Sequence, residues 1–117
     1  QLGNKIKTLI NQIPNGIFEL SDELIKYASK ELNVKFDNQI YVSLSDHIAL
    51  AIKRYKKEIV LKNDLLEEIR RVHRDEFKVA LNMVNIINKR LNINLPIDEA
   101  AFITLHLVNK GYCSELS

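Results

Sequence analysis

Apolar residues recur along the chain at spacings of three and four, which is the period of an amphipathic helix. We expect five helices, over about residues 21–33, 40–56, 63–72, 75–91 and 98–110, and a short lead-in helix over residues 4–13. Glycine and proline are scarce, with three and two residues, which also favours helices. Since each predicted helix has one apolar face, the pattern predicts an all-α, compact bundle of five helices.

Three polar residues are expected to begin helices. Ser21 precedes two acidic residues and predicts the N-cap of the first of the five helices, while Asp37 and Asn63 are candidate caps for the next two. The segment 40–44 also alternates with the period of a strand, but no partner strand is predicted elsewhere. We therefore expect it to be helical, in a helix that begins as early as Asp37 or Asn38.

Length and charge narrow the class of protein. A chain of 117 residues predicts a single domain over 1–117, with a frayed tail over 112–117. The formal charge of +2 is too small to indicate a nucleic-acid-binding surface. The chain begins at Gln1 without a methionine, which suggests a piece of a longer protein.

Cysteine content and hydropathy indicate the compartment. The one cysteine, Cys113, can form neither a disulfide framework nor a zinc-ligand set, which fits a reducing, cytoplasmic location. No apolar run approaches the roughly 20 residues of a membrane span, so no membrane insertion is expected.

His47 and His106 each lie within an apolar, helix-like run. An imidazole can accept and release a phosphoryl group near neutral pH, and a carboxylate beside it can fix its tautomer and leave the other nitrogen free. Asp46 precedes His47, although adjacent side chains on a helix diverge by about 100°. The alternative interpretation is a pair of satisfied core histidines beside a surface acid, and the local sequence leaves both open.

Other candidate sites are weaker. His73 lies in a mixed-charge stretch typical of a solvated helix or an inter-helix corner. No metal-ligand spacing, glycine-rich phosphate loop or nucleophile motif is present in the sequence, so neither a metal nor a cofactor nor an enzymatic activity is predicted. A basic cluster of Lys53, Arg54, Lys56 and Lys57 ends one predicted helix, which the helix dipole explains, although Arg54 could also contact a partner or a phosphate.

Together these segments resemble a known family. Residues 40–54 and 95–109 are each similar to a histidine signature of the PTS regulation domain, and residues 62–69, 75–77 and 24–28 also match. The similarity covers nearly the whole chain. It is strongest to the first of two such domains in bacterial transcriptional antiterminators of the BglG/SacY type.

The resemblance implies a regulatory phosphoacceptor domain that forms homodimers and is not an enzyme. Its partners would be phosphotransferase-system proteins, namely the sugar permease component and the phosphocarrier protein. RNA would be bound only through an N-terminal domain absent from this chain. Phosphorylation on histidine would control dimerisation and the RNA-binding activity of the full protein. The alternatives are a nucleic-acid-binding helical domain, using the basic cluster, or a purely structural dimerisation domain.

The resemblance also assigns residues. His47 and His106 match the two phosphorylatable histidines, Asp46 matches the acid before the first, and Arg54 matches the arginine that ends the same motif. One departure is Ala101, which stands where the family often has glycine. A second departure is His73, which stands where a tyrosine is common.

Overall fold

The structure, a computed structural model, describes residues 16–111. It contains the helices α2 (Ile17–Leu32), α3 (Gln39–Lys56), α4 (Leu66–Val72), α5 (Arg74–Leu91) and α6 (Asp98–Gly111), and residues 16–111 include no strand. The prediction of five helices in an all-α fold is confirmed. The expected lead-in helix over residues 4–13, the tail 112–117 and Cys113 lie outside the described residues.

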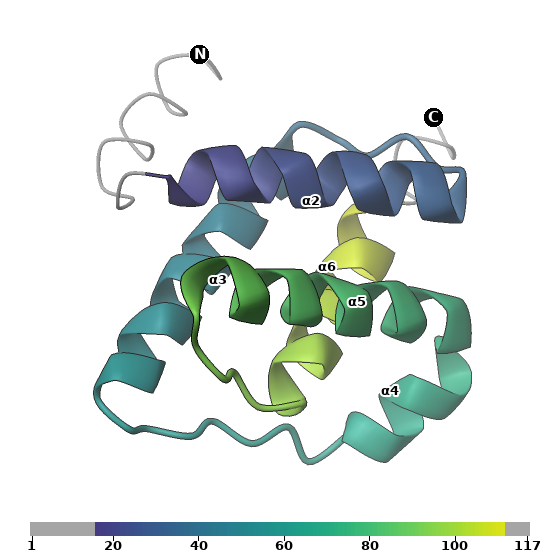
Figure 1. Ribbon diagram of the computed structural model, residues 1–117. Helices are drawn as coiled ribbons and strands as arrows, with labels where there is room; N and C mark the ends of the chain where they lie inside the picture. Colours follow the sequence, from purple (N-terminus) through teal and green to yellow (C-terminus); the bar gives the residue numbers. More distant parts are fainter. Residues whose placement is uncertain (1–15, 112–117) are drawn as a thin grey trace.

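The helices pack in two crossing layers. Figure 1 shows α2 and α5 running across the molecule, one above the other, with α3 and α6 crossing behind them. The most extensive contacts join α5 to α6 and α2 to α3, and α3 also packs against α6. Each of the helices α2 to α6 contributes to one apolar core, which includes Leu24, Ile25, Ile40, Leu44, Ile48, Ile69, Met83, Ile87, Ile103 and Leu107. No helix among the described residues is long and apolar enough to cross a membrane.

The predicted N-cap at Ser21 is wrong. The helix begins four residues earlier, at Ile17, after Gly16 in a left-handed conformation with φ 89°. Ser21 is fully buried inside the helix, and its hydroxyl donates to the carbonyl of Ile17 at 2.8 Å. The apolar stripe already starts with Ile17 and Leu20, so burial of these residues sets the helix start and outweighs the local cap signal.

The predicted helix through residues 40–44 is confirmed. Helix α3 begins at Gln39, whose backbone N–H donates to the Asp37 carboxylate at 3.2 Å. Asn63 acts in the same way before α4, since its side-chain oxygen accepts from the N–H of Leu65 at 2.9 Å. Because α3 starts this early, His47 lies in its middle, far from the N–H groups of the helix N-terminus.

Three of the helices end with a residue in the left-handed conformation. Asn33 and Asn92 do so after α2 and α5, and asparagine tolerates this backbone. After α3 the same position is taken by Glu58, with φ 58°. The N–H of Ile59 donates to the carbonyl of Arg54 at 2.9 Å and the N–H of Glu58 donates to Tyr55 at 3.0 Å, which is the Schellman pattern. This turn fixes the last turn of α3, where Arg54 lies.

We predict that Glu58→Gly stabilises the protein by about 0.5–1 kcal/mol, because glycine adopts the left-handed region without the strain of a side chain. Chemical denaturation followed by circular dichroism measures the change. Lys57→Gly, at the preceding position, is the matched control. Lys57 has φ −92°, so a glycine there relieves no backbone strain and should destabilise the protein. A loss of stability in Glu58→Gly would contradict the assignment of this turn.

Candidate functional site

The candidate site lies where α3 and α6 face each other. His47 and Arg54 are seven residues apart on α3, and Glu99 and His106 are seven residues apart on α6. Seven residues are close to two full helical turns, so each pair lies on one face of its helix. The packing of α3 against α6 brings the two pairs together.

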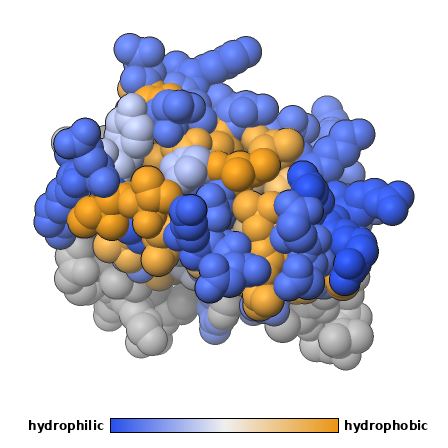
Figure 2. All heavy atoms as spheres, turned by 90° about the horizontal axis from the view of Figure 1, so that it is seen from below, coloured by the Kyte–Doolittle hydropathy of each residue, from blue (hydrophilic) through white to orange (hydrophobic). Residues whose placement is uncertain are grey.

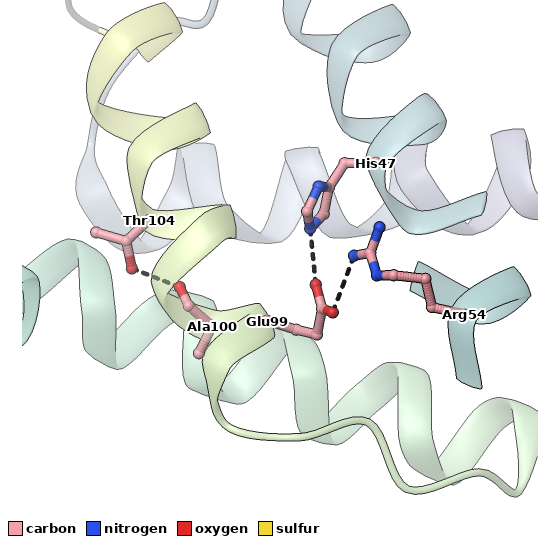
Figure 3. A network of polar contacts seen from close by, with 5 residues as sticks. All are labelled: His47, Arg54, Glu99, Ala100 and Thr104. Carbon is pink, nitrogen blue, oxygen red and sulfur yellow. Dashed lines mark hydrogen bonds and ion pairs between the residues drawn. The ribbon is translucent and has the colours of Figure 1, made fainter. Parts of the chain in front are cut away.

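Glu99 is the residue that joins the two helices. Its side chain is only 3% exposed, and its two carboxylate oxygens contact different partners. Oε1 lies 2.8 Å from Nε2 of His47, and Oε2 accepts from the Arg54 guanidinium at 3.0 Å (Figure 3). A buried carboxylate without partners would be strongly destabilising, so these two contacts make the burial of Glu99 possible.

The charge state of Glu99 follows from these contacts. Burial by itself raises the pKa of the Glu99 carboxyl, since it disfavours the charged form. The hydrogen bonds and charges of His47 and Arg54 act in the opposite direction and prevail, so the pKa lies below its ordinary value of 4.5. Glu99 is therefore a carboxylate at neutral pH.

The two sequence-predicted histidines lie side by side. The ring centroids of His47 and His106 are 5.1 Å apart, with the planes tilted by 53°. The ring of Phe102 lies 5.7 Å from that of His47 and closes the site on the α6 side. The side chain of His47 is 13% exposed, so its ring is largely enclosed but retains some contact with solvent.

Two loops hold the start of α6 in place. The N–H of Asn63, in the connection between α3 and α4, donates to the Asp98 carboxylate at 2.8 Å. The N–H of Leu95 donates to the side-chain oxygen of Asn88, on α5, at 2.8 Å. Within α6, the hydroxyl of Thr104 donates to the carbonyl of Ala100 in the first turn at 2.7 Å (Figure 3). These bonds fix the first turn of α6 and with it the position of Glu99.

A groove leads from the surface to Glu99. It has a volume of about 450 Å³, and its lining includes Tyr55, Ile59, Val60 and Pro96. Ile59 and Val60 are 53% and 61% exposed. The face of the molecule on which the connection between α3 and α4 lies carries apolar surface between hydrophilic side chains (Figure 2). Exposed apolar surface next to a polar site is typical of places where another molecule binds.

Asp46, the acid beside His47 in the sequence, is not the acid that contacts its ring. It is exposed and makes no hydrogen bond with His47, because neighbouring side chains on a helix point in different directions. The acid that contacts the imidazole comes instead from α6. Arg54 points inward to Glu99, so only the lysines of the basic cluster are exposed.

Glu99 was missed by the sequence analysis. An acid in the first turn of a helix has a sufficient local explanation in the helix dipole, and that explanation hid its second role. The signal that could have found it is the spacing: Glu99 precedes His106 by the same seven residues that separate His47 from Arg54. Two facing helices that each carry an ionisable pair at this spacing can form a four-residue cluster.

The remaining candidates lie elsewhere. His73 is half-buried at the junction of α4 and α5, where its carbonyl accepts from the N–H of Phe77 at 2.8 Å. Ala101 is fully buried in the core. Within residues 16–111 no group of three or more histidine, cysteine or acidic side chains is arranged to hold a metal ion.

Arg54→Met should lower the free energy of unfolding by about 2 kcal/mol, because it leaves the buried Glu99 carboxylate without its charged donor. Urea denaturation at neutral pH measures this loss. Arg90→Met is the control, since Arg90 contacts Glu23 on the surface with 50% and 57% of the two side chains exposed, and its loss should be much smaller. Equal losses in the two variants would contradict the structural importance of the buried pair.

The lowered pKa of Glu99 makes stability depend on pH. A carboxyl whose pKa is lower in the folded than in the unfolded state stabilises the fold above its ordinary pKa, here 4.5, and loses that contribution as the pH falls through its folded pKa. The free energy of unfolding of Glu99→Gln should therefore decline less between pH 6 and pH 3 than that of the unmodified chain. Glu68→Gln, at an exposed position on α4, should leave the decline unchanged. Parallel curves for all three proteins would refute this role of Glu99.

Comparison with known proteins places these observations in a family. Residues 22–110 match the family described as PRD domain. The transcription antiterminator LicT of Bacillus subtilis (strain 168) is 43% identical over 115 residues, which are 98% of this chain and 42% of LicT. The beta-glucoside operon antiterminator of Dickeya chrysanthemi is 36% identical over 109 residues, covering 93% of this chain and 38% of the relative.

A solved structure of a related protein has a similar fold. The crystal structure of GlcT CAT-PRDI superposes with a TM-score of 0.87 at 29% sequence identity, covering 92% of this chain and 64% of that chain. The chain thus spans about two fifths of the length of the antiterminators it matches. The match over residues 22–110 includes the four residues of the cluster, which are His47, Arg54, Glu99 and His106. The chain belongs to the PRD domain family.

Proposed function

We propose that this chain is a regulatory phosphoacceptor domain of a bacterial transcriptional antiterminator, and not an enzyme. The phosphotransferase system would phosphorylate His47 and His106 and so control dimerisation and RNA binding of the full protein, in the cytoplasm. The observation that carries the proposal is the pairing of the two imidazoles, with ring centroids 5.1 Å apart, in a chain of the PRD domain family.

The surroundings of the imidazoles suit a group that is modified by another protein. The His47 ring is partly exposed, and a groove reaches the neighbouring Glu99 from the surface. The guanidinium of Arg54 is close by, and its Nε is a buried donor without a hydrogen-bond partner among the described residues. Arg54 therefore keeps one donor that the contact with Glu99 does not use.

A phosphoryl group would change the charge of the site strongly. It adds nearly two negative charges near the Glu99 carboxylate, which Arg54 contacts as the one lysine or arginine that does so within residues 16–111. If two copies associate with their sites near the two-fold axis, the added charges repel one another across it. The unmodified chain would then favour a compact homodimer and the phosphorylated chain a loosened one, since a few kcal/mol is enough to invert such an equilibrium.

We predict that the purified chain takes up an acid-labile phosphoryl group from phosphoenolpyruvate in the presence of the first enzyme of the system and either the phosphocarrier protein or the permease component. The double variant His47→Ala/His106→Ala should lose the label, and His73→Ala should keep it, because His73 lies at the junction of α4 and α5, away from the cluster. Mass spectrometry under alkaline conditions locates the modification. Full labelling of the double variant would refute the proposed function.

The same samples test the effect on assembly. Sedimentation velocity of the unmodified chain should show a dimer that weakens at least about tenfold on phosphorylation, which corresponds to about 1.4 kcal/mol. If mass spectrometry confirms phosphorylation and the association constant of the dimer does not change, phosphorylation does not control dimerisation. That result would contradict this part of the proposal.

A further inference from the structure

We propose that Glu99 is a positioning residue that holds His47 in the tautomer protonated at Nε2, so that Nδ1 is the nitrogen that accepts the phosphoryl group. Arg54 contributes by holding Glu99. This inference rests on the proposed phosphoacceptor function and specifies its geometry.

The hydrogen bond between Glu99 and His47 determines the tautomer. Oε1 of Glu99 lies 2.8 Å from Nε2 of His47, which is hydrogen-bond distance. A carboxylate has only acceptor sites, so Nε2 must be the donor and must carry a hydrogen. A neutral imidazole has one such hydrogen, and Nδ1 therefore carries the lone pair.

The position of the carboxylate is itself fixed. Oε2 accepts from Arg54 at 3.0 Å, and the side chain is 3% exposed, so Glu99 cannot turn away into solvent without breaking both contacts. Figure 3 shows Glu99 between the two α3 side chains, with one oxygen directed at each. The second ring nitrogen of His47 lies on the side of the ring that does not face Glu99 (Figure 3). The contact with Glu99 is made by Nε2 and not by Nδ1.

The transfer then requires no proton to leave His47. The Nδ1 lone pair forms a bond to the phosphorus of a phosphorylated side chain on the donor protein. The donor's bond to phosphorus breaks, and its electron pair stays on the donor atom. The His47 ring becomes positively charged while Nε2 keeps its hydrogen, and the Glu99 carboxylate stabilises this charge through the bond it already makes. The reverse transfer uses the same groups.

Within residues 16–111, Glu99 is the acid that contacts the His47 ring. Asp46 is exposed and does not contact the imidazole. His106 has its ring centroid 5.1 Å away and is an imidazole, which can donate or accept and so does not dictate a tautomer. The assignment therefore depends on Glu99 alone, and Asp46 offers a matched control.

The first test reads the tautomer directly in the unmodified chain. Histidine labelled with ¹⁵N and long-range proton–nitrogen correlation spectra distinguish a protonated from an unprotonated ring nitrogen. We expect Nε2 of His47 to be protonated and Nδ1 to be bare, in the unmodified chain and in Asp46→Asn. A His47 protonated at Nδ1 would overturn the inference.

The second test reads the site of modification. After phosphorylation by the phosphoenolpyruvate-driven donor, the phosphorus–nitrogen coupling should identify Nδ1-phosphohistidine at residue 47. Glu99→Gln should slow labelling of His47 by at least about tenfold, because a glutamine amide can donate to Nε2 and so favours the wrong tautomer. The Asp46→Asn protein should be phosphorylated at the same rate as the chain without substitutions.

The outcomes separate this inference from the function beneath it. Phosphohistidine formed at Nε2 of residue 47 overturns the inference and leaves the proposed function intact. A chain that takes up no phosphoryl group on either histidine overturns the proposed function, and the tautomer spectrum still decides whether Glu99 fixes the ring. The nitrogen of His47 that carries the phosphoryl group is identified in the chain without substitutions. A Glu99→Gln protein that fails to fold therefore does not block the test.

Discussion

The buried carboxylate of Glu99 is the constraint on which the site depends. A charged group with 3% exposure must be paired, and both of its partners come from one face of α3. The pairing therefore fixes how α3 lies against α6. Because His106 is two turns farther along α6 than Glu99, it is carried to a position opposite His47. One ion-paired contact thus sets the separation of the two imidazoles, although it involves only one of them.

The helices could be predicted from the sequence because burying an apolar face is a local pattern repeated every three or four residues. Residues 40–44 illustrate its strength, since their alternation was compatible with a strand and the stripe that continues through Ile48 still made them helical. Ser21 illustrates its limit. A serine followed by acids resembles an N-cap, but Ile17 and Leu20 belong to the same buried stripe and begin the helix earlier. A cap is worth about 1 kcal/mol, whereas two buried aliphatic side chains contribute more.

The candidate site could be predicted only in part. His47 and His106 stand out because an ionisable side chain in an apolar run is unusual, and the structure places them in contact. Their neighbour could not be identified from adjacency, since Asp46 is next to His47 in sequence and points elsewhere. Glu99 lies 52 residues away from its imidazole partner. Its seven-residue spacing from His106 marks it as a candidate, but only the packing of α3 on α6 shows that it contacts His47. Contacts between elements are a tertiary property, which local propensity does not encode.

The same pairing explains why the proposed site would respond strongly to modification. In the unmodified chain the Glu99 charge is balanced by one contacting cation, Arg54, so the enclosed cluster is close to neutral. Little positive charge in contact with the cluster is left to neutralise a phosphoryl group, because the lysines near the end of α3 are exposed and directed to solvent. With Nε2 held by Glu99, phosphorylation at Nδ1 would keep the α3–α6 contact while placing the new charge on the side of the ring away from it. The fold of one copy would then persist, and the excess charge would act on whatever lies against that side, which in the proposed function is a second copy of the chain.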